Sequence, residues 1–229
     1  MGKKKIIAIA CGVYVLILLI GGAVYFSLSQ QTAQNAAEQS TETVSQTAKT
    51  EKNNAAEEKV RDQKEKELLA NLTVEDHGAL TLYTNDYPKK PSPGVYLRPF
   101  VATDGSRYVL KFDLYYYYNI KDGEQTAWIH GDTLDVDIDG TRQTLDFVPQ
   151  ERWDKMSQDA ENLAENYVQD ATPTELTILK RIGQAKSVTL HYYQKESGEG
   201  RSQQLTQEEM TKIRNMVAFY KLKQQDTEG

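Results

Sequence analysis

Three segments in the middle of the sequence contain side chains that could do chemistry. Four consecutive tyrosines occupy positions 115–118, a His-Gly-Asp segment follows at 130–132, and aspartates alternate with apolar residues at 135–139. Tyrosines are typical of binding surfaces, and a histidine near an aspartate is typical of general-base catalysis. Alternating aspartates are typical of calcium loops. Each chemical interpretation competes with a structural one, and the elements around the segments decide between them.

The acidic segment fits a calcium loop only in part. Asp135, Asp137, Asp139 and Gly140 match the first, third, fifth and sixth positions of an EF-hand loop. The eighth position holds Arg142, where an apolar residue is usual. The alternation with apolar residues predicts a half-buried strand, and an Asp-Gly pair is typical of a hairpin turn. We interpret the segment as a strand and a hairpin, with calcium binding by the three aspartates as the alternative, and expect no cofactor.

The histidines and the cysteine do not form a known catalytic or metal-binding pattern. His77, His130 and His191 are far apart, and the only cysteine, Cys11, lies in an apolar segment near the N-terminus. The sequence also contains no nucleophile elbow, phosphate-binding glycine loop or dinucleotide motif. These observations favour a non-enzymatic protein. The alternative is a hydrolase whose site combines His130 with Asp132 and nearby tyrosines.

The tyrosine run divides between two faces if it belongs to a strand, because successive side chains point to opposite sides. Tyr116 and Tyr118 share a face with an apolar series and are expected in the core. Tyr115 and Tyr117 share the other face with charged residues, where they either pack under a helix or bind a partner. The proline-rich loop 85–94 is the second candidate for binding. The predicted binding residues are Tyr115, Tyr117, Tyr87, Lys89 and Lys90.

The tyrosine strand belongs to a series of short β-like segments separated by turns. Strands that follow one another with only turns between them are typical of an antiparallel meander. Pro99 indicates an edge position or a bulge within its segment. The expected strands are 79–83, 95–103, 107–120, 126–130, 133–138, 142–148, 187–193 and 201–205.

Helices are expected late in the chain. Capping boxes at Thr172/Glu175 and Thr206/Glu209 predict two helix starts, the first helix ending near residue 184. The segment 151–169 predicts a further helix, because its apolar residues recur at steps of three and four and form one buried stripe. These apolar residues are Trp153, Met156, Ala160, Leu163 and Tyr167.

The N-terminus predicts a membrane anchor. Residues 1–5 contain three lysines, and residues 6–26 contain no charged side chain. A helix of that length spans about 31 Å, which matches the hydrocarbon core of a bilayer. The lysines favour a cytoplasmic N-terminus, which places the following residues outside the plasma membrane. A cleaved signal peptide is the alternative, but its apolar core is shorter than this one.

The rest of the chain divides into three parts. Residues 27–71 contain no glycine, proline or aromatic residue, and we expect a polar stalk that is helical or disordered. Residues 72–224 predict an extracytoplasmic α+β domain, with a mainly antiparallel sheet or sandwich and two or three packed helices. Residues 225–229 are expected to form a disordered tail.

Charge limits the possible partners. The 229 residues carry a formal net charge of −6, which argues against a nucleic-acid partner. We expect contact with the lipid bilayer through residues 6–26 and with an unidentified protein or other component of the envelope. The sequence therefore favours a non-enzymatic binding or scaffolding module of the cell envelope. The hydrolase and a structural subunit of a membrane complex remain the alternatives.

Overall fold

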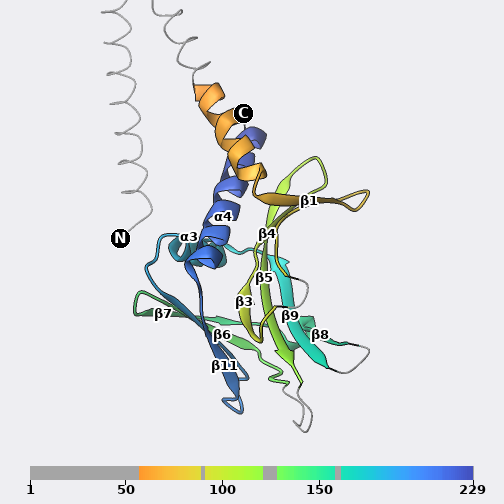
Figure 1. Ribbon diagram of the computed structural model, residues 1–229, viewed down its shortest axis with the longest axis vertical. Coiled ribbons are helices and arrows are strands. Elements are labelled where there is room, and N and C mark those ends of the chain that lie inside the picture. The colour runs from red at the N-terminus through yellow and green to blue at the C-terminus, as the bar shows by residue number, and fades with distance from the viewer. Residues whose placement is uncertain (1–56, 89–90, 121–127, 158–160, 229) are drawn as a thin grey trace, which may run out of the picture. The chain divides into compact units, whose positions relative to one another are not determined.

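The computed structural model describes residues 57–88, 91–120, 128–157 and 161–228. This part of the chain combines antiparallel β-sheets with three helices (Figure 1), which confirms the expected α+β class. The residues from Arg61 to the C-terminus form one compact unit.

The larger sheet contains seven strands, and every pairing in it is antiparallel. Its order is β1-β2-β4-β5-β9-β8, and β3 also pairs with β5 beyond the end of β4. The chain leaves β3 and enters β4 at Arg98 and Pro99, where the single expected strand 95–103 is interrupted. The strands are β1 (Leu72–Asp76), β2 (Thr81–Asn85), β3 (Gly94–Leu97), β4 (Phe100–Thr103), β5 (Tyr108–Asn119), β8 (Trp153–Met156) and β9 (Asn162–Asp170).

The smaller sheet contains the acidic segment. Its order is β11-β10-β6-β7, again antiparallel throughout. Asp139 and Gly140 have φ values of 50° and 82°, as a tight hairpin turn requires, so the predicted strand and hairpin are confirmed. The strands are β6 (Thr133–Ile138), β7 (Thr141–Asp146), β10 (Val188–Tyr193) and β11 (Gly200–Gln204), and a short 3₁₀ helix, η1 (Pro149–Glu151), follows β7.

The helices begin where the capping residues predict. The Thr172 side chain accepts a hydrogen bond from the Glu175 amide at the start of α3 (Pro173–Ile182), and the Glu175 carboxylate accepts one from the Thr172 amide. The same reciprocal pair, Thr206 with Glu209, precedes α4 (Gln207–Glu228). A further helix covers residues 57–69, within the expected stalk. The sequence predicts a disordered tail at 225–229, whereas α4 extends through residue 228 of this segment.

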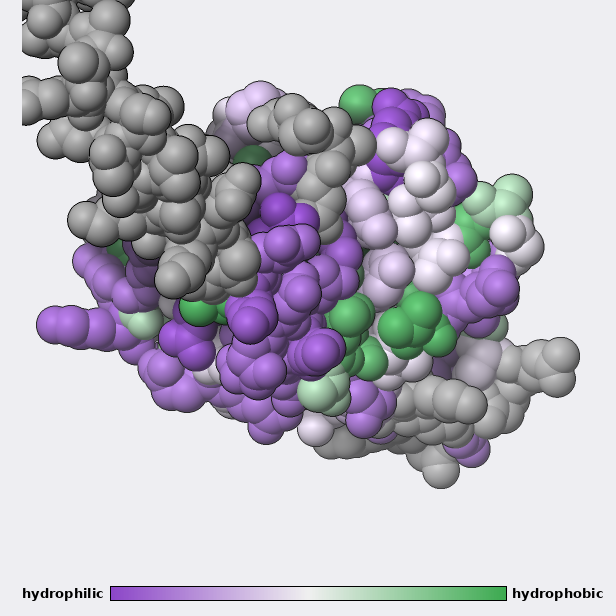
Figure 2. Space-filling model, turned by 90° about the horizontal axis from the view of Figure 1, so that it is seen from above, coloured by the Kyte–Doolittle hydropathy of each residue, from purple (hydrophilic) through white to green (hydrophobic). Residues whose placement is uncertain are grey.

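One hydrophobic core joins both sheets to the helices. Tyr116, Phe112 and Leu114 of β5 are fully buried in it together with apolar residues of β6, β10, α3 and α4. Figure 1 shows α4 running alongside the larger sheet with α3 next to it. Seen from above (Figure 2), most of the described surface is hydrophilic, with a small number of hydrophobic residues between the polar ones.

The helix expected at 151–169 is wrong, because this segment forms β8 and β9. β9 pairs with β5 over nine residues, from Lys111–Asp170 to Asn119–Asn162. Leu163 and Tyr167 are buried, as either structure would require, but Trp153 and Met156 are 77% and 42% exposed. The apparent helical stripe therefore combines residues that face the core with residues that do not. Long-range pairing with β5 outweighs the local helical pattern.

Other expectations concern residues outside the described part of the chain. Within that part, no helix is both long enough and apolar enough to cross a bilayer. The expected membrane span, residues 6–26, lies outside it, as do most of the stalk and residues 121–127. Of the strand expected at 126–130, residues 128–130 are described and form no strand.

Candidate functional site

β5 presents its tyrosines to two different environments. Tyr116 is fully buried, and Tyr118 is half-buried against the same core, as the alternation predicts. Tyr115 and Tyr117 lie on the opposite face, where their rings stack with centroids 6.2 Å apart. The Tyr117 hydroxyl donates a hydrogen bond of 2.7 Å to the Asn162 side chain, which fixes its position. Tyr115 is half-exposed and therefore available to a partner.

The register of the larger sheet extends this face across four strands. Tyr96 of β3 lies opposite Tyr115, which lies opposite Asn166 of β9, and Asn166 lies opposite Trp153 of β8. Directly opposed residues of an antiparallel pair point to the same side of the sheet. A row with three aromatic residues thus crosses the sheet and ends at the exposed Trp153. We call Tyr87, Tyr96, Tyr115, Tyr117 and Trp153, together with Arg98, the aromatic face.

Arg98 connects the aromatic residues at the point where β3 ends. Its guanidinium carbon lies 3.5 Å from the Tyr115 ring centroid and 5.9 Å from that of Tyr87. The same guanidinium forms an ion pair of 3.2 Å with the buried Asp113, while the Asp113 backbone carbonyl accepts a hydrogen bond from the Arg98 amide. The Lys212 ammonium of α4 lies 5.3 Å from the centroid of the Tyr87 ring, which Arg98 also approaches. Cations and rings therefore alternate along this surface.

Two buried polar atoms of the aromatic face have no hydrogen-bond partner among the described residues. They are the hydroxyl of Tyr87 and Nε of Arg98. Burial raises the pKa of the Tyr87 hydroxyl, although the nearby Arg98 charge lowers it, so the hydroxyl stays protonated and can donate. Leaving such a buried group unpaired costs about 1–3 kcal/mol. Both atoms are shielded from solvent, so a partner reaches them only after neighbouring side chains move.

Three cavities adjoin the aromatic face. The first, about 390 Å³, is lined by Tyr87, Arg98 and Asp113, among others, and the second, about 240 Å³, lies between Tyr87, Tyr96 and the start of α4. The third, also about 240 Å³, adjoins Tyr115 and Tyr117. Spaces beside the partly exposed rings of Tyr87, Tyr96 and Tyr115 are suited to holding the side groups of an extended ligand, whereas Tyr117 is buried.

Tyr115 and Tyr96 of this face also stay uncharged at neutral pH, because the pKa of each is raised. Burial raises the pKa of Tyr115, and the neighbouring Tyr117 adds to this effect, whereas Arg98 opposes it. Burial raises the pKa of Tyr96 as well, with Glu209 as the second cause. The aromatic face therefore offers neutral hydroxyls and one guanidinium, and these groups suit recognition better than acid–base catalysis.

His130 and Asp132 do not contact each other. His130 Nδ1 lies 3.1 Å from the Arg152 guanidinium and 3.6 Å from the Asp154 carboxylate. The Asp132 carboxylate instead accepts hydrogen bonds from the Thr133 hydroxyl and the Lys195 amide. Asp132 therefore does not orient His130 in the way that the aspartate of a catalytic His-Asp pair does. The hydrolase stays an untested prediction.

A buried carboxylate organises the same loop. Glu165 of β9 is 1% exposed and accepts hydrogen bonds from the backbone amides of Ile129, His130 and Gly131, at 2.7 to 3.1 Å. It also accepts one from the Tyr192 hydroxyl. These bonds hold His130 in a left-handed conformation, with φ at 51°. We interpret Glu165 as a structural group that fixes the loop before β6.

The aspartates of the acidic segment are bonded within the protein. Asp135 accepts from the Thr144 hydroxyl and pairs with Arg142, and Asp137 accepts from the Gly140 amide. Asp139 accepts from two backbone amides before β10. Among the described residues, no group of three acidic, histidine or cysteine side chains could hold a metal ion.

The sequence reasoning found part of the aromatic face and missed the rest. Tyr87, Tyr115 and Tyr117 belong to it, while Lys89 and Lys90 lie outside the described residues. Trp153 was missed because the sequence predicted it on the buried stripe of a helix. Arg98 was missed because no pattern in the neighbouring sequence indicates that it lies against β5. Burial in β9 does not alternate from one residue to the next, so no local pattern in the sequence reveals this register. No known protein family, curated protein or solved structure matches this chain at a significant level.

Proposed function

We propose that this chain is a non-enzymatic binding module of the cell envelope, held at the plasma membrane by residues 6–26. The aromatic face is its binding surface, and its partner is an extended component of the envelope. The observation that carries the proposal is the row of Tyr96, Tyr115 and Trp153 across the sheet, with the Arg98 guanidinium carbon 3.5 Å from the Tyr115 ring centroid. Large rings and an arginine are the residues that most often dominate binding free energy.

The arrangement supports binding in a second way. Side chains held by a sheet lose little conformational freedom when a partner binds, and tyrosine has few rotatable bonds. Tyr115 is held between Arg98 and Tyr117, and Tyr117 is held by Asn162. The surface is therefore organised before a partner arrives, as recognition requires.

The test is co-sedimentation of the full chain, in neutral detergent, with envelope fragments from the source cells. We expect Tyr115→Ala with Trp153→Ala to weaken retention by about thirtyfold, which corresponds to about 2 kcal/mol for loss of dominant aromatic contacts. The matched control is Val74→Ala with Leu80→Ala, which removes exposed apolar side chains of the β1–β2 hairpin. Equal retention of both double variants, with unchanged thermal unfolding, would refute the aromatic face as the binding surface.

A further inference from the structure

A second cavity of different chemistry lies among the helices. It measures about 300 Å³ and is bordered by α3, α4 and the helix at 57–69. The apolar residues Val217, Ala218 and Leu222 of α4 form part of its lining, and two of them are buried. The other lining residues are polar: Lys64, Lys180, Gln184, Arg214, Lys221 and Gln225. We call this the basic cavity.

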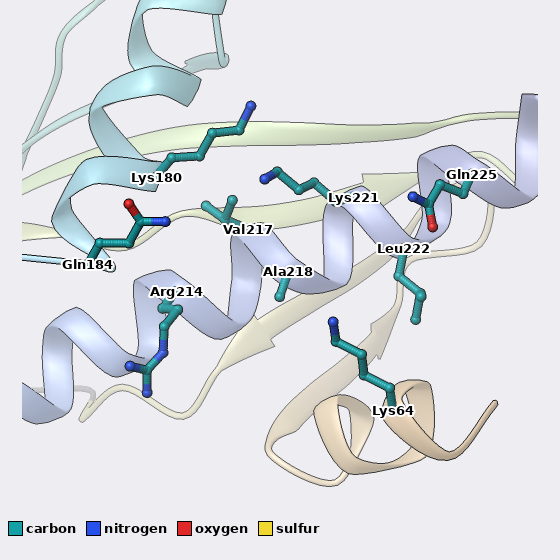
Figure 3. Close-up of a pocket in the computed structure, with 9 residues that line it drawn as sticks. All are labelled: Lys64, Lys180, Gln184, Arg214, Val217, Ala218, Lys221, Leu222 and Gln225. Carbon is teal, nitrogen blue, oxygen red and sulfur yellow. The ribbon is translucent and has the colours of Figure 1, made fainter. Parts of the chain in front are cut away.

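The basic cavity concentrates positive charge on an acidic protein. Four of its lining residues are cationic, and no described carboxylate lines it, whereas the whole chain has a net charge of −6. Figure 3 shows Lys221 extending toward α3, where Lys180 and Gln184 lie, and Lys64 extending toward α4. Like charges that line one cavity repel each other, so an anion bound among them is favoured electrostatically.

The neighbouring carboxylates are engaged elsewhere. On the helix at 57–69, Glu65 pairs with Lys223, and Glu67 accepts a hydrogen bond from Gln63. On α4, Glu208 pairs with Lys212 at 2.8 Å. Lys64, Lys180 and Lys221 form no ion pair with a described residue, and the Arg214 guanidinium hydrogen-bonds, among the described residues, only to the Thr211 hydroxyl, at 3.4 Å. Four cationic side chains that line one cavity therefore form no ion pair with a described carboxylate.

The close packing of α3 against α4 sets the width of the basic cavity. Gly183, which ends α3, lies directly against Arg214, and a Cβ at this position would stand 2.8 Å from the Arg214 Cβ. This contact keeps the C-terminal end of α3, with Lys180 and Gln184, next to the middle of α4. The cations consequently come from three separate helices that the fold holds in fixed positions.

We propose that the basic cavity binds an anion that carries two phosphate groups. Lysine ammonium and arginine guanidinium groups are the usual protein ligands of phosphate, and their charge-assisted hydrogen bonds are strong. The volume suffices for a diphosphate-sized group, since it equals that of roughly ten water molecules. The amides of Gln184 and Gln225 add neutral donors. The same chemistry is available from a soluble diphosphate and from a lipid headgroup that carries two phosphates.

The experiment titrates the full chain, in a neutral detergent, with inorganic pyrophosphate and follows binding by isothermal calorimetry. We expect saturable binding with one site per chain. Lys180→Gln with Lys221→Gln should weaken it at least tenfold. Lys66→Gln with Lys186→Gln changes the net charge equally at exposed positions outside the cavity and should change binding less than twofold.

The outcomes separate the proposal from its alternatives. Absence of saturable binding, or equal weakening by both double variants, would overturn the proposal, because a non-specific charge effect does not depend on position. Repeating the titration with cardiolipin, whose headgroup carries two phosphates, mixed into the detergent identifies the source of the phosphate. Weaker apparent pyrophosphate binding in the mixture indicates a lipid headgroup as the occupant, and unchanged binding indicates a soluble ligand. Neither result depends on the aromatic face.

Discussion

Individual residues of this protein take roles that their types alone do not reveal. Glu165 lies in a segment whose polar residues suggest a solvent-exposed surface, yet its buried carboxylate receives three backbone amides and a tyrosine hydroxyl. Burial, and next the Glu165 charge, raises the pKa of Tyr192, so that hydroxyl remains a donor. Arg98 similarly acquires its role only when β3 and β5 pair. Such roles come from long-range contacts, which no local pattern encodes.

A residue-scale prediction concerns Asp104, in the turn between β4 and β5. Its carboxylate accepts bonds from the Ser106 hydroxyl and from the Ser106 and Arg107 amides, and these lower its pKa from 3.8 to about 2. A carboxylate whose pKa is lowered by folding stabilises the fold above pH 3.8 and loses that contribution as the pH falls toward 2. We expect Asp104→Asn to destabilise the protein above pH 4 and the difference from wild type to shrink toward pH 2.

Urea unfolding between pH 2 and pH 6 measures this effect. Ser106→Ala removes the largest cause of the pKa shift and should move the acid-dependent loss of stability to higher pH. A difference between wild type and Asp104→Asn that stays constant over the whole range would contradict the prediction.

At the scale of elements, a helix or strand could be predicted from the sequence where contacts between adjacent residues determine it. The α3 capping box and the β6–β7 hairpin were predictable, because a few adjacent residues determine each. The segment 151–169 was not, because its stripe of apolar residues fits a helix and only pairing with β5 selects strands. The same error concealed Trp153, so part of the candidate site was missed together with the element that presents it.

An element-scale prediction concerns the contact between α3 and α4. Gly183 has φ at −63°, which alanine adopts easily, and on backbone grounds Gly183→Ala should stabilise by about 0.4–1 kcal/mol. The added Cβ, however, would meet the Arg214 Cβ at 2.8 Å and its Cα at 3.0 Å. We therefore expect net destabilisation of about 1–3 kcal/mol, as for other overpacked contacts.

Thermal and urea unfolding of Gly183→Ala measure the change. Arg214→Ala keeps its own Cβ, so Gly183→Ala should cost about the same in that background. An unfolding midpoint equal to or above that of wild type would show that α4 moves aside without cost.

At the scale of the whole molecule, one core connects most of the described elements, including the helix at 57–69 and α4. Leu68, Leu69 and Leu72 pack against this core, and Lys223 of α4 pairs with Glu65. The aromatic face and the basic cavity belong to this one unit, and the cavities beside the aromatic face share no lining residue with the basic cavity. The two proposed sites can thus be altered independently.

The proposed anchor gives a whole-molecule prediction. Deleting residues 1–56 should move the protein from the membrane pellet to the soluble fraction, because residues 6–26 carry the only long apolar segment. The unfolding midpoint should stay within a few degrees of that of the full chain, since the deleted residues lie outside the compact unit beginning at Arg61. Cell fractionation and circular dichroism measure both quantities. A full-length chain that remained soluble after fractionation would refute the anchor.

The ion pair between Glu65 and Lys223 has a practical consequence for engineering. It places the point where the chain enters the compact unit beside the last turns of α4 (Figure 1), so entry and exit lie close together. Domains with adjacent ends tolerate insertion into a host protein and circular permutation. A fluorescent reporter fused after residue 229 would emerge near the entry point and leave Trp153 uncovered. Such a fusion could follow the protein in living cells without blocking the aromatic face.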